Sequence, residues 1–582
     1  MMGNEDEPRI GVFVCHCGHN IAGTVDVEAV ARVARHYPNV AYTVDLMFTC
    51  SDAGQTHIRE AIAEHNLNRV VVASCSPRMH EPTFRRVVEE AGLNRYLFEQ
   101  VNLREHCSWC HAREPEKATI KAEDLVRMAV ARAALLEPLE VKTVEVTPHT
   151  LVVGGGVTGL RAAVDIGSRG FKATVVEKES ELGGHLRHLS TMYPNNEKAE
   201  DVIDRMLIAA RAIADIEIMT DSVVVDLDGH IGSFETKIKN MKSGKTVKRT
   251  FGAVIMATGF EPFEPEGYYE YGNNPNIITL AEYEKMKSTG SVLRISDGRP
   301  PKQVMFIGCV GSREEGNKGH EHCSRYCCTA MTKAACDIKD ETEEVMVLYD
   351  DLRTFGRGHE EIHREARQKH VMFSKFAHTK KPKVCLKDDR IIVKWKDVLS
   401  GTYCEFEPEM LVLTTAMVPP AGTDEVAKLF SLTRSGDGFF NEEHIKLAPL
   451  TTHTAGIMIA GVAQSAKDAT DSATQASGAA AKATSLMARK NVEIESTVSW
   501  VDETLCSSCH TCVQACPYGA IEMATTKDPP VAFVTEAKCH GCGTCAAACP
   551  SNAITMRHST DEQIISMVEA FLIPPPVEGG GE

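Results

Sequence analysis

The sequence lacks any run of about 18 consecutive apolar residues, so no segment is expected to cross a lipid bilayer as a helix. The first residues, MMGNEDEPRI, also lack the apolar core of a secretory signal peptide, which predicts a cytoplasmic protein. Basic residues are also fewer than acidic ones, 63 Lys and Arg against 80 Asp and Glu, and the formal net charge is −17. Because nucleic acids and anionic membranes repel an acidic protein, neither is expected as the main partner.

Cysteine, by contrast, is abundant, with 21 residues in a chain of 582. In a reducing compartment, cysteines at this density serve metal or redox chemistry and not disulfide bonds. Most of them fall in three groups, within residues 15–110, 309–336 and 506–549. The chain is also too long for one hydrophobic core, so we expect three or four domains.

The C-terminal group predicts two [4Fe–4S] clusters. Cys506 opens the pattern C-x2-C-x2-C-x3-C-P, and Cys539 opens a second copy of it. In this pattern three closely spaced thiolates bind one cluster, and the fourth cysteine of each copy binds the other cluster. Zinc sites are the alternative, but zinc favours two cysteine pairs separated by a longer loop. The predicted ligand sets are Cys506, Cys509, Cys512 and Cys549 for one cluster, and Cys539, Cys542, Cys545 and Cys516 for the other.

A dinucleotide fingerprint begins directly after the apolar run LVV and reads Gly154-x-Gly156-x-x-Gly159. The first glycine permits the tight turn, the second lets a pyrophosphate approach the backbone, and the third lets the helix pack closely. The helix that follows points its N-terminus at the phosphates. Glu177 ends the next predicted strand, where a carboxylate that binds the ribose belongs. The predicted strand, the predicted helix and the carboxylate of a dinucleotide-binding site therefore all accompany the glycine fingerprint.

Three later segments, ELGGHL, ATG and TAGIMIAGVA, resemble the FAD-contacting segments of thioredoxin-reductase-like flavoproteins. In the last of them Val462 stands where an aspartate is usual, so a ribityl contact is lost or comes from another residue. NAD in the same fold, or a degenerate Rossmann fold, is the alternative to FAD. The predicted FAD-binding residues are Gly154, Gly156, Gly159, Glu177, Lys178, Gly183, Gly184, Ala257, Thr258, Gly259, Gly461 and Val462.

The flavin domain lacks the thiol pair of a disulfide reductase. The segment LGGHLRHL contains no cysteine, and outside the ferredoxin motifs C-x-x-C occurs only at Cys107–Cys110. Where NADPH would bind, the fingerprint that starts at Gly308 reads GCVG, so Cys309 occupies the turn meant for a pyrophosphate. We therefore expect neither dithiol chemistry at this flavin nor NAD(P) in the second Rossmann domain.

The same cysteine opens a further motif, C-x13-C-x3-CC. Four thiolates this close in sequence, across a loop and a helix start, can surround a [4Fe–4S] cluster, and buried core cysteines are the alternative. Lys333 and Lys467 lie near these motifs and could favour an anionic reduced flavin by charge, although most lysines are simply solvated. The predicted ligands of this middle cluster are Cys309, Cys323, Cys327 and Cys328.

Five cysteines of the N-terminal domain are candidates for another [4Fe–4S] cluster. Cys15, Cys17, Cys50 and Cys75 follow predicted parallel strands, and the carboxyl ends of such strands meet at one edge of a sheet. Cys107, in the segment REHCSWC, is a further candidate. Because the ligands come from separate loops, spacing cannot choose four among the five.

The order of strand-like and helix-like segments predicts an α/β protein with a Rossmann-like N-terminal domain, a thioredoxin-reductase-like FAD core and a bacterial-type 2[4Fe–4S] ferredoxin domain. In the core, two Rossmann units are interleaved, since the second is inserted into the first. The predicted domains are residues 1–140 (N-terminal), 148–300 with 440–490 (FAD-binding, discontinuous), 301–440 (second Rossmann unit with a [4Fe–4S] site), 495–560 (ferredoxin) and 561–582 (C-terminal helix and flexible tail).

The segments GVFVCHCGHNIAGTVD, VVVASCSPRMHEPTFRR, REHCSW and QASGAAAKA, together with C-x13-C-x3-CC, resemble the A-type iron–sulfur subunit of CoB–CoM heterodisulfide reductase. Some members of that family carry an additional ferredoxin domain between the two flavin motifs. Residues 184–308 contain no cysteine here, so that domain is missing. The resemblance implies a complex in which FAD splits electron pairs between ferredoxin and a higher-potential acceptor, which in methanogens is the disulfide of coenzyme M and coenzyme B.

The resemblance also implies partners. These are heterodisulfide reductase B- and C-type subunits, ferredoxin, and a small iron–sulfur adaptor with a hydrogenase or formate dehydrogenase; we further expect a homodimer within the larger complex. From the residues alone, a flavin beside clusters converts electron pairs into single electrons. Two other readings stay open, namely a stand-alone NAD(P)H- or thiol-linked flavin reductase and a scaffold with relic motifs.

Overall fold

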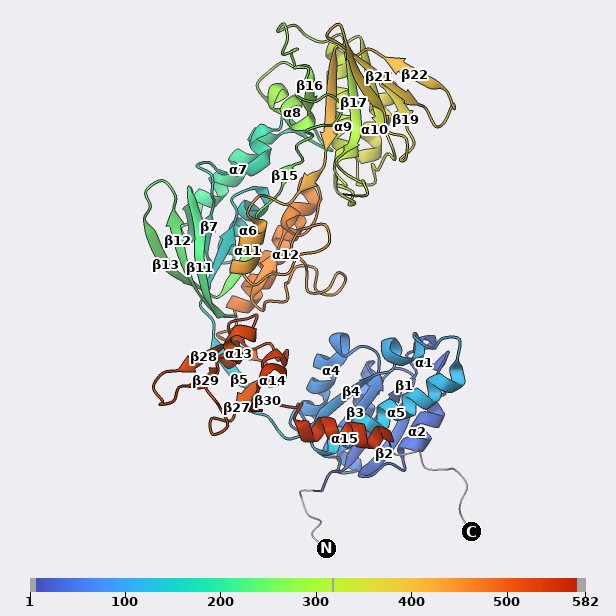
Figure 1. Ribbon diagram of the computed structural model, residues 1–582, viewed down its shortest axis with the longest axis vertical. Helices are drawn as coiled ribbons and strands as arrows, with labels where there is room; N and C mark the ends of the chain where they lie inside the picture. Colours follow the sequence, from blue (N-terminus) through green and yellow to red (C-terminus); the bar gives the residue numbers. More distant parts are fainter. Residues whose placement is uncertain (1–6, 317–318, 573–582) are drawn as a thin grey trace. The chain divides into compact units, whose positions relative to one another are not determined.

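The computed structural model describes residues 7–316 and 319–572. The chain forms two compact units, one made of Met1–Thr143 with Glu493–Glu582 and the other of Val144–Val492. The first unit therefore takes in both ends of the chain, and the second is continuous in sequence. Figure 1 labels many of the helices and strands of each unit.

The N-terminal domain of the first unit is a four-stranded parallel sheet with the order β2-β1-β3-β4. Both faces of the sheet are covered, because Val12 and Val14 of β1 pack into one hydrophobic cluster and Phe13 packs into another. The strands are β1 (Ile10–Cys15), β2 (Val40–Leu46), β3 (Arg69–Ser74) and β4 (Phe98–Asn102), and the helices are α1 (His19–Ala22), α2 (Val27–Ala34), α3 (Asp52–Glu64), α4 (Pro77–Glu90), the π-helix η1 (Arg104–Ser108) and α5 (Pro115–Ala134).

The C-terminal part of the first unit is a small repeat. Two antiparallel strand pairs, β27-β30 and β28-β29, accompany two short helices that contact each other. Its elements are β27 (Ser499–Val501), α13 (Thr511–Ala515), β28 (Ile521–Ala524), β29 (Val531–Val534), η5 (Glu536–Lys538), α14 (Thr544–Ala548) and β30 (Ile554–Met556).

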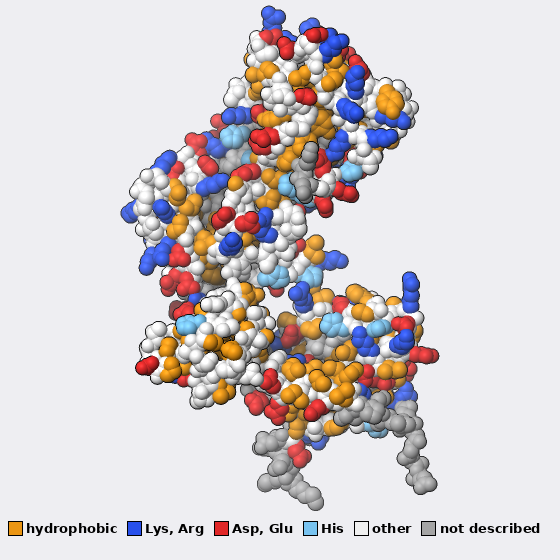
Figure 2. Space-filling model, viewed as in Figure 1, with side chains coloured by type: hydrophobic (Ala, Val, Ile, Leu, Met, Phe, Trp, Pro, Cys, Tyr) orange, Lys and Arg blue, Asp and Glu red, His pale blue; other side chains and the backbone are white. Residues whose placement is uncertain are grey.

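Helix α15 (Asp561–Leu572) packs along α5 of the same unit. Gln563 Nε2 donates to Leu135 O at 3.0 Å, and Arg127 Nε donates to Ala570 O at 2.7 Å. Figure 2 shows hydrophobic side chains gathered over this helix, because its large apolar residues face outward. The flexible tail predicted beyond it, residues 573–582, lies outside the described residues. The outward apolar residues are Ile564, Ile565, Val568, Phe571 and Leu572.

The second unit contains two parallel sheets. The first has the order β10-β7-β6-β14-β25, and its edge strand β25 returns from much later in the chain. Helices α6 and α12 pack against each other through small residues such as Ala163 and Ala479. The elements are β6 (His149–Val153), α6 (Val157–Gly167), β7 (Lys172–Val176), α7 (Ala199–Ala212), β10 (Ile216–Met219), β14 (Ala253–Met256), β25 (Ile457–Ile459) and α12 (Ala469–Met487).

The second sheet has the order β16-β23-β17-β18-β19, and all its strands lie in sequence between β14 and β25. The predicted interleaving of two Rossmann units is therefore present. Its elements are β16 (Ile277–Thr279), α8 (Leu280–Ser288), β17 (Gln303–Val310), α9 (Cys327–Ile338), β18 (Glu344–Tyr349), α10 (His359–Gln368), β19 (Met372–Lys375) and β23 (Met410–Thr415).

Smaller elements complete the second unit and its borders. Two antiparallel sheets have the orders β11-β12-β13 and β20-β21-β22. In sequence, the first falls between β10 and β14 and the second between β19 and β23. They comprise β11 (Ser222–His230), β12 (Ser233–Asn240), β13 (Thr246–Phe251), β20 (Lys383–Lys387), β21 (Arg390–Lys396) and β22 (Tyr403–Phe406), and the short elements are β5 (Lys142–Glu145), η2 (Gly184–His188), β8 (Thr191–Met192), β9 (Glu197–Lys198), β15 (Glu261–Pro262), η3 (Lys339–Glu341), β24 (Met417–Val418), α11 (Thr423–Leu429), η4 (Gly461–Ala463) and β26 (Asn491–Ile494).

Replacing Arg127 by methionine tests how α15 is held. The substitution removes the bond to Ala570 O and the ion pair with Asp124, whose Nη2–Oδ1 distance is 2.6 Å. We expect the free energy of opening α15 to fall by about 1–3 kcal/mol, because these polar contacts are buried or nearly so. Amide hydrogen exchange in residues 561–572 should accelerate while the parallel sheet stays protected. Lys117→Met is the control, since this α5 side chain is 73% exposed; equal exchange in both variants would contradict the assigned role.

Candidate functional site

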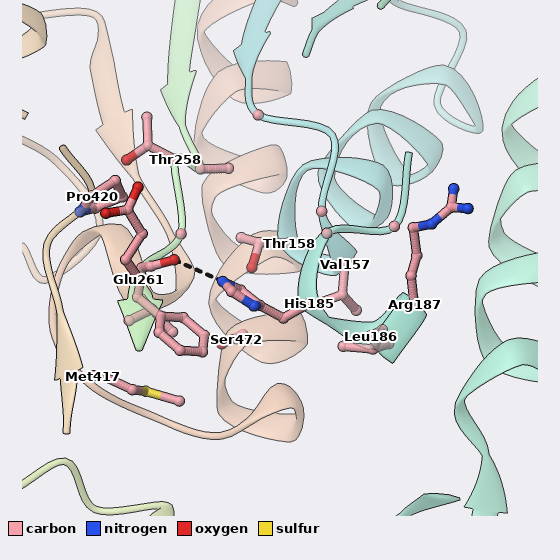
Figure 3. Close-up of a pocket in the computed structure, with 18 of the residues that line it drawn as sticks. Val157, Thr158, His185, Leu186, Arg187, Thr258, Glu261, Met417, Pro420 and Ser472 are labelled. Carbon is pink, nitrogen blue, oxygen red and sulfur yellow. Dashed lines mark hydrogen bonds between the residues drawn. The ribbon is translucent and has the colours of Figure 1, made fainter. Parts of the chain in front are cut away.

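The second unit holds a cavity of about 880 Å³. Figure 3 shows part of its lining, including Thr158, His185 and Thr258. The volume is near the upper end of the range for ligand pockets, roughly 300–1,000 Å³, as a dinucleotide requires. Of the predicted FAD-binding residues the cavity is lined by Gly154, Gly156, Glu177, Lys178, Gly183, Gly184, Ala257, Thr258, Gly259 and Val462, and its lining does not include Gly159 and Gly461.

The turn from β6 into α6 explains the glycine fingerprint. Gly154 has a φ of 111°, and a Cβ there would lie 2.3 Å from Ala257 O. A Cβ on Gly159 would lie 1.8 Å from Gly154 O, so this position acts through close packing and not by lining the cavity. Gly156 begins α6 without a side-chain cap, which leaves the first amides of the helix available to a ligand. The residues present therefore fit a pyrophosphate group.

Glu177 lies at the end of β7 and is 8% exposed. One of its oxygens accepts the Gly155 N–H at 2.6 Å, and the other accepts the Glu179 N–H at 2.9 Å. A carboxylate has about four lone-pair sites, so acceptor capacity remains for ribose hydroxyls. The neighbouring Lys178 is more exposed, and its Nζ lies 4.0 Å from the Glu261 carboxylate.

Lys333 extends from α9 into the cavity lining and is 3% exposed. Its Nζ lies 3.2 Å from Glu284 Oε1 and 3.3 Å from Asp337 Oδ2, and it donates to Ser190 Oγ at 3.2 Å. Ser190 donates its backbone N–H and its hydroxyl to the other oxygen of Glu284. Burial raises the pKa of Asp337, and Lys333 opposes that rise. Sequence reasoning missed Glu284 and Ser190, because only the fold brings them to this lysine.

Lys467 also lines the cavity and is 3% exposed, in the loop between η4 and α12. Its Nζ donates to Gly461 O at 2.7 Å, to Ser465 O at 2.6 Å and to Gln464 Oε1 at 3.0 Å. Burial lowers the pKa of Lys467 to about 7, and the positive charge of Arg325 contributes to the decrease. The ammonium group of Lys467 therefore loses its proton near neutral pH.

His185 was not singled out from the sequence, although it follows directly after the two glycines of ELGGHL. Its Nε2 donates to Phe260 O at 2.7 Å, as the dashed line in Figure 3 marks, and its ring stacks on Phe260 with the centroids 4.2 Å apart. Because a carbonyl oxygen can only accept, Nε2 carries the proton. The contact joins the ELGGHL segment to the residue after the ATG segment. It therefore holds together two segments that resemble FAD-contacting segments of flavoproteins.

The four cysteines predicted for the middle cluster come from the end of β17, the following loop and the start of α9. Burial raises the pKa of Cys309 to about 12, and Cys328 and Cys323 add to the rise. A hydrogen bond between Cys327 and Cys328 raises the pKa of Cys327 and lowers that of Cys328. The thiols are therefore close enough to oppose one another's ionisation, which a bound metal cluster would relieve.

The eight ferredoxin cysteines form two separate groups. Backbone amides donate to their sulfurs, for example Ala520 N to Cys516 Sγ at 3.3 Å and Ala553 N to Cys549 Sγ at 3.3 Å, which suits ligating thiolates. Within residues 7–316 and 319–572, no three His, Cys, Asp or Glu side chains converge so as to hold a single metal ion. One small cavity is lined by Cys506, Cys509, Cys512 and Cys549, and a second by Cys516, Cys539, Cys542 and Cys545.

In the N-terminal domain the structure brings four of the five candidate cysteines together. Burial raises the pKa of Cys75 to about 12, and the negative charges of Cys17, Cys15 and Cys50 add to the rise. Burial likewise raises the pKa of Cys50, again with contributions from Cys15 and Cys17. Cys15 is the last residue of β1, and Cys17, Cys50 and Cys75 follow β1, β2 and β3, so all four lie at the carboxyl edge of the sheet.

Cys107 lies apart from that group. It is fully buried in η1, and its thiol donates to Ala118 O at 3.0 Å. The charges that affect its pKa, after burial, are those of Lys121 and Cys110 and not those of the other four thiols. Arg104, which was not predicted, instead provides the positive charge beside Cys75 and lies over the Trp109 ring at 5.0 Å.

Two family models match the chain. Residues 148–318 match the pyridine nucleotide-disulphide oxidoreductase model, and residues 491–554 match the 4Fe-4S dicluster domain model. With the sheets described above, these matches confirm the predicted fold class. They also identify an oxidoreductase that is a flavoprotein with 4Fe-4S chemistry.

Curated relatives match most of the chain, and each is the A-type subunit of a larger enzyme. That of the H(2):CoB-CoM heterodisulfide,ferredoxin reductase of Methanothermobacter marburgensis is 39% identical over 602 residues, which cover 89% of this chain and 91% of the relative. The A-type iron-sulfur subunit of the CoB--CoM heterodisulfide reductase of Methanocaldococcus jannaschii is 37% identical, with 88% and 91% covered. That of the H(2)/formate:CoB-CoM heterodisulfide,ferredoxin reductase of Methanococcus maripaludis is 33% identical, with 88% and 91% covered.

Solved structures that match are more distant. Thioredoxin reductase of T. acidophilum has a TM-score of 0.41 and 14% identity, covering 58% of this chain and 99% of its own. That of Lactococcus lactis has a TM-score of 0.42 and 17% identity, covering 59% and 99%. In the part of the chain that the structure describes, no helix is both long and apolar enough to cross a membrane.

The pKa of Lys467 predicts a pH-dependent stability in flavin-free protein. Between about pH 7 and 10.5 the unfolded state binds this proton and the folded state does not, so stability should rise with pH. Below pH 7 the lysine is charged in both states and the full cost of burying it remains. The gain is on the order of 1.4 kcal/mol per pH unit. In denaturation curves at pH 6.5 to 10, Lys467→Met should abolish this rise in stability with pH. Lys482→Met, a control at an exposed position on α12, should keep the rise. If the free energy of unfolding changes with pH in the same way in both variants, the assignment is refuted.

Proposed function

The chain belongs to the family of A-type heterodisulfide reductase subunits, and we propose that it distributes electrons at its flavin between two acceptors in a complex of that type. The observation that carries the proposal is the presence, in one chain, of a glycine-lined dinucleotide cavity and four groups of cysteines. FAD exchanges electrons in pairs or singly, whereas a [4Fe–4S] cluster exchanges one. Together they convert electron pairs into single electrons.

In the proposed FAD site, the first amides of α6 bind the pyrophosphate and Glu177 accepts the ribose hydroxyls. Gly183 and Gly259 have φ values of 110° and 74°, so the backbone can approach the ligand without a side chain in the way. His185 keeps the ELGGHL and ATG segments together through Phe260. Each of these residues serves binding and orientation, and the redox chemistry is supplied by FAD when it is bound.

Lys333 and Lys467 are proposed to set the charge around the reduced flavin. A positive charge near the ring stabilises an anionic reduced form and so raises its potential. Lys333 is held by Glu284, so its effect depends on how far that carboxylate offsets its charge. Lys467, with its pKa of about 7, can hold or release a proton at the cavity lining as the local charge changes.

The proposed cluster ligands come from three parts of the chain. Cys107 is left out of the N-terminal set because its thiol points to Ala118 O. The four sets are Cys15, Cys17, Cys50 and Cys75; Cys309, Cys323, Cys327 and Cys328; Cys506, Cys509, Cys512 and Cys549; and Cys516, Cys539, Cys542 and Cys545.

The names of the relatives suggest the partners. They include a CoB–CoM heterodisulfide, ferredoxin, hydrogen and formate. We propose that electrons enter from a hydrogenase or formate dehydrogenase through a small iron–sulfur adaptor and leave to ferredoxin and to B- and C-type subunits. Among the described residues that line the flavin cavity none is a cysteine, which supports disulfide reduction by one of those partners. The proposal also includes a cytoplasmic homodimer within the larger complex.

Cofactor analysis of the anaerobically purified chain tests the assignment. We expect about one FAD and about 16 iron atoms per chain, four for each of four clusters. Cys75→Ser should remove about four irons, whereas the matched variant Cys107→Ser should remove none, because its thiol faces Ala118 O. A chain without flavin, or with fewer than about eight irons, would refute the proposal. Rapid NAD(P)H or disulfide turnover without partners would favour the stand-alone reductase instead.

Paired substitutions at Lys333 test its electrostatic role. Lys333→Met should make the flavin potential more negative, and Glu284→Gln should make it more positive, because they remove opposite charges from one buried pair. Lys339→Met, close in sequence but half-buried, outside the cavity lining and bonded to Glu343 O, is the control. The potentials are measured by spectroelectrochemical titration. Shifts of the same sign in both variants would indicate a packing effect and contradict the charge assignment.

A further inference from the structure

The two halves of the ferredoxin part differ at one buried position. The repeat that relates the two cysteine motifs also relates Ser499 on β27 to Ala532 on β29. Strand pairing follows the same repeat, since Ser499 pairs with Met556 and Ala532 pairs with Met523. Both residues are 3% exposed. The backbone is therefore equivalent at this position, but one half presents a hydroxyl group and the other a methyl group.

The hydroxyl lies against the sulfurs of one cysteine group. Ser499 Oγ is 3.4 Å from Cys539 Sγ, and the same side chain hydrogen-bonds the Cys545 thiol. All three residues line the cavity of the second cysteine group. At the matching point of the first group, Ala532 donates its backbone N–H to Cys506 Sγ at 3.4 Å and has no hydroxyl to offer.

The other hydroxyl groups near the sulfurs are either matched in the two halves or more open to water. Thr544 Oγ1 lies 3.3 Å from a cysteine sulfur of the second group, and its counterpart Thr511 hydrogen-bonds a cysteine of the first. Ser551 and Ser507 approach the first group from exposed or half-exposed positions, where water competes for the same sulfurs. Ser499 is the buried hydroxyl that breaks the symmetry.

We propose that Ser499 is a positioning residue that raises the reduction potential of the cluster bound by Cys516, Cys539, Cys542 and Cys545, so that single electrons rest on that cluster in preference to its neighbour. A sulfur bound to iron carries no proton, so the hydroxyl must donate to it. Such a bond offsets negative charge that grows when the cluster is reduced, and burial keeps water from replacing the bond. The inference rests on the proposed cluster ligands.

The test exchanges the two side chains in the full chain, purified anaerobically. Redox titration followed by electron paramagnetic resonance should resolve the two C-terminal clusters. Ser499→Ala should move one midpoint to a more negative potential and leave the other unchanged. Ala532→Ser should move the other midpoint to a more positive potential. The double variant, with Ser499→Ala and Ala532→Ser, should narrow or invert the difference between the two midpoint potentials. Iron and flavin content should be unchanged in every variant.

A third variant separates hydrogen bonding from packing. Ser499→Thr keeps the hydroxyl and suits a β-strand, so it should retain the wild-type midpoint. The inference is overturned if the Ser499→Ala variant keeps its iron and neither midpoint potential moves. It is also overturned if the midpoint potential shifts as far in Ser499→Thr as in Ser499→Ala. In both cases the cluster assignment stands. A wild-type chain without these clusters would overturn the proposed function instead.

Discussion

Buried thiols that lie close together cannot all lose their protons unless a cation lies among them. In this chain burial raises the pKa of Cys75 and of Cys309 to about 12, and neighbouring cysteines add to both. At the proposed cluster sites, iron ligation would remove these protons and offset the charge, so the binding free energy of the metal would also become folding free energy for the loops that carry the thiols.

Parallel sheets provide the frame for the three proposed sites outside the ferredoxin part. In the first unit, the carboxyl edge of β1, β2 and β3 gathers cysteines. In the first sheet of the second unit, the corresponding turn after β6 presents glycines and helix amides. In the second sheet, the end of β17 carries Cys309 where a nucleotide-binding protein would have a glycine-rich loop. We propose that one architecture serves both dinucleotide and metal binding through different residues at the strand ends and in the loops and helices that follow them.

The sequence predicted best what is encoded locally. The ferredoxin spacing and the glycine fingerprint lie on single short segments, so their groupings could be read directly, and the interleaved fold was confirmed. Contacts between distant segments could not be read in this way. Sequence spacing does not distinguish Cys75 from Cys107 as a proposed ligand. The distinction comes from the fold, which places Cys75 beside the other three thiols at the sheet edge and Cys107 in the π-helix against Ala118 O. Likewise, Glu284 reaches Lys333 only because α8 and α9 belong to one folded unit.

The interleaved sheets impose an order on biosynthesis. Residues that line the proposed flavin cavity range from Val153 to Ser472, so the site stays incomplete until Ser472 has left the ribosome. The first unit waits longer still, because α15, which packs on α5, follows the whole second unit in the chain. The middle cysteines, which lie within 309–328, are synthesised before either event. The proposed ligands of the middle cluster are therefore all translated before the cavity proposed to hold the flavin is complete.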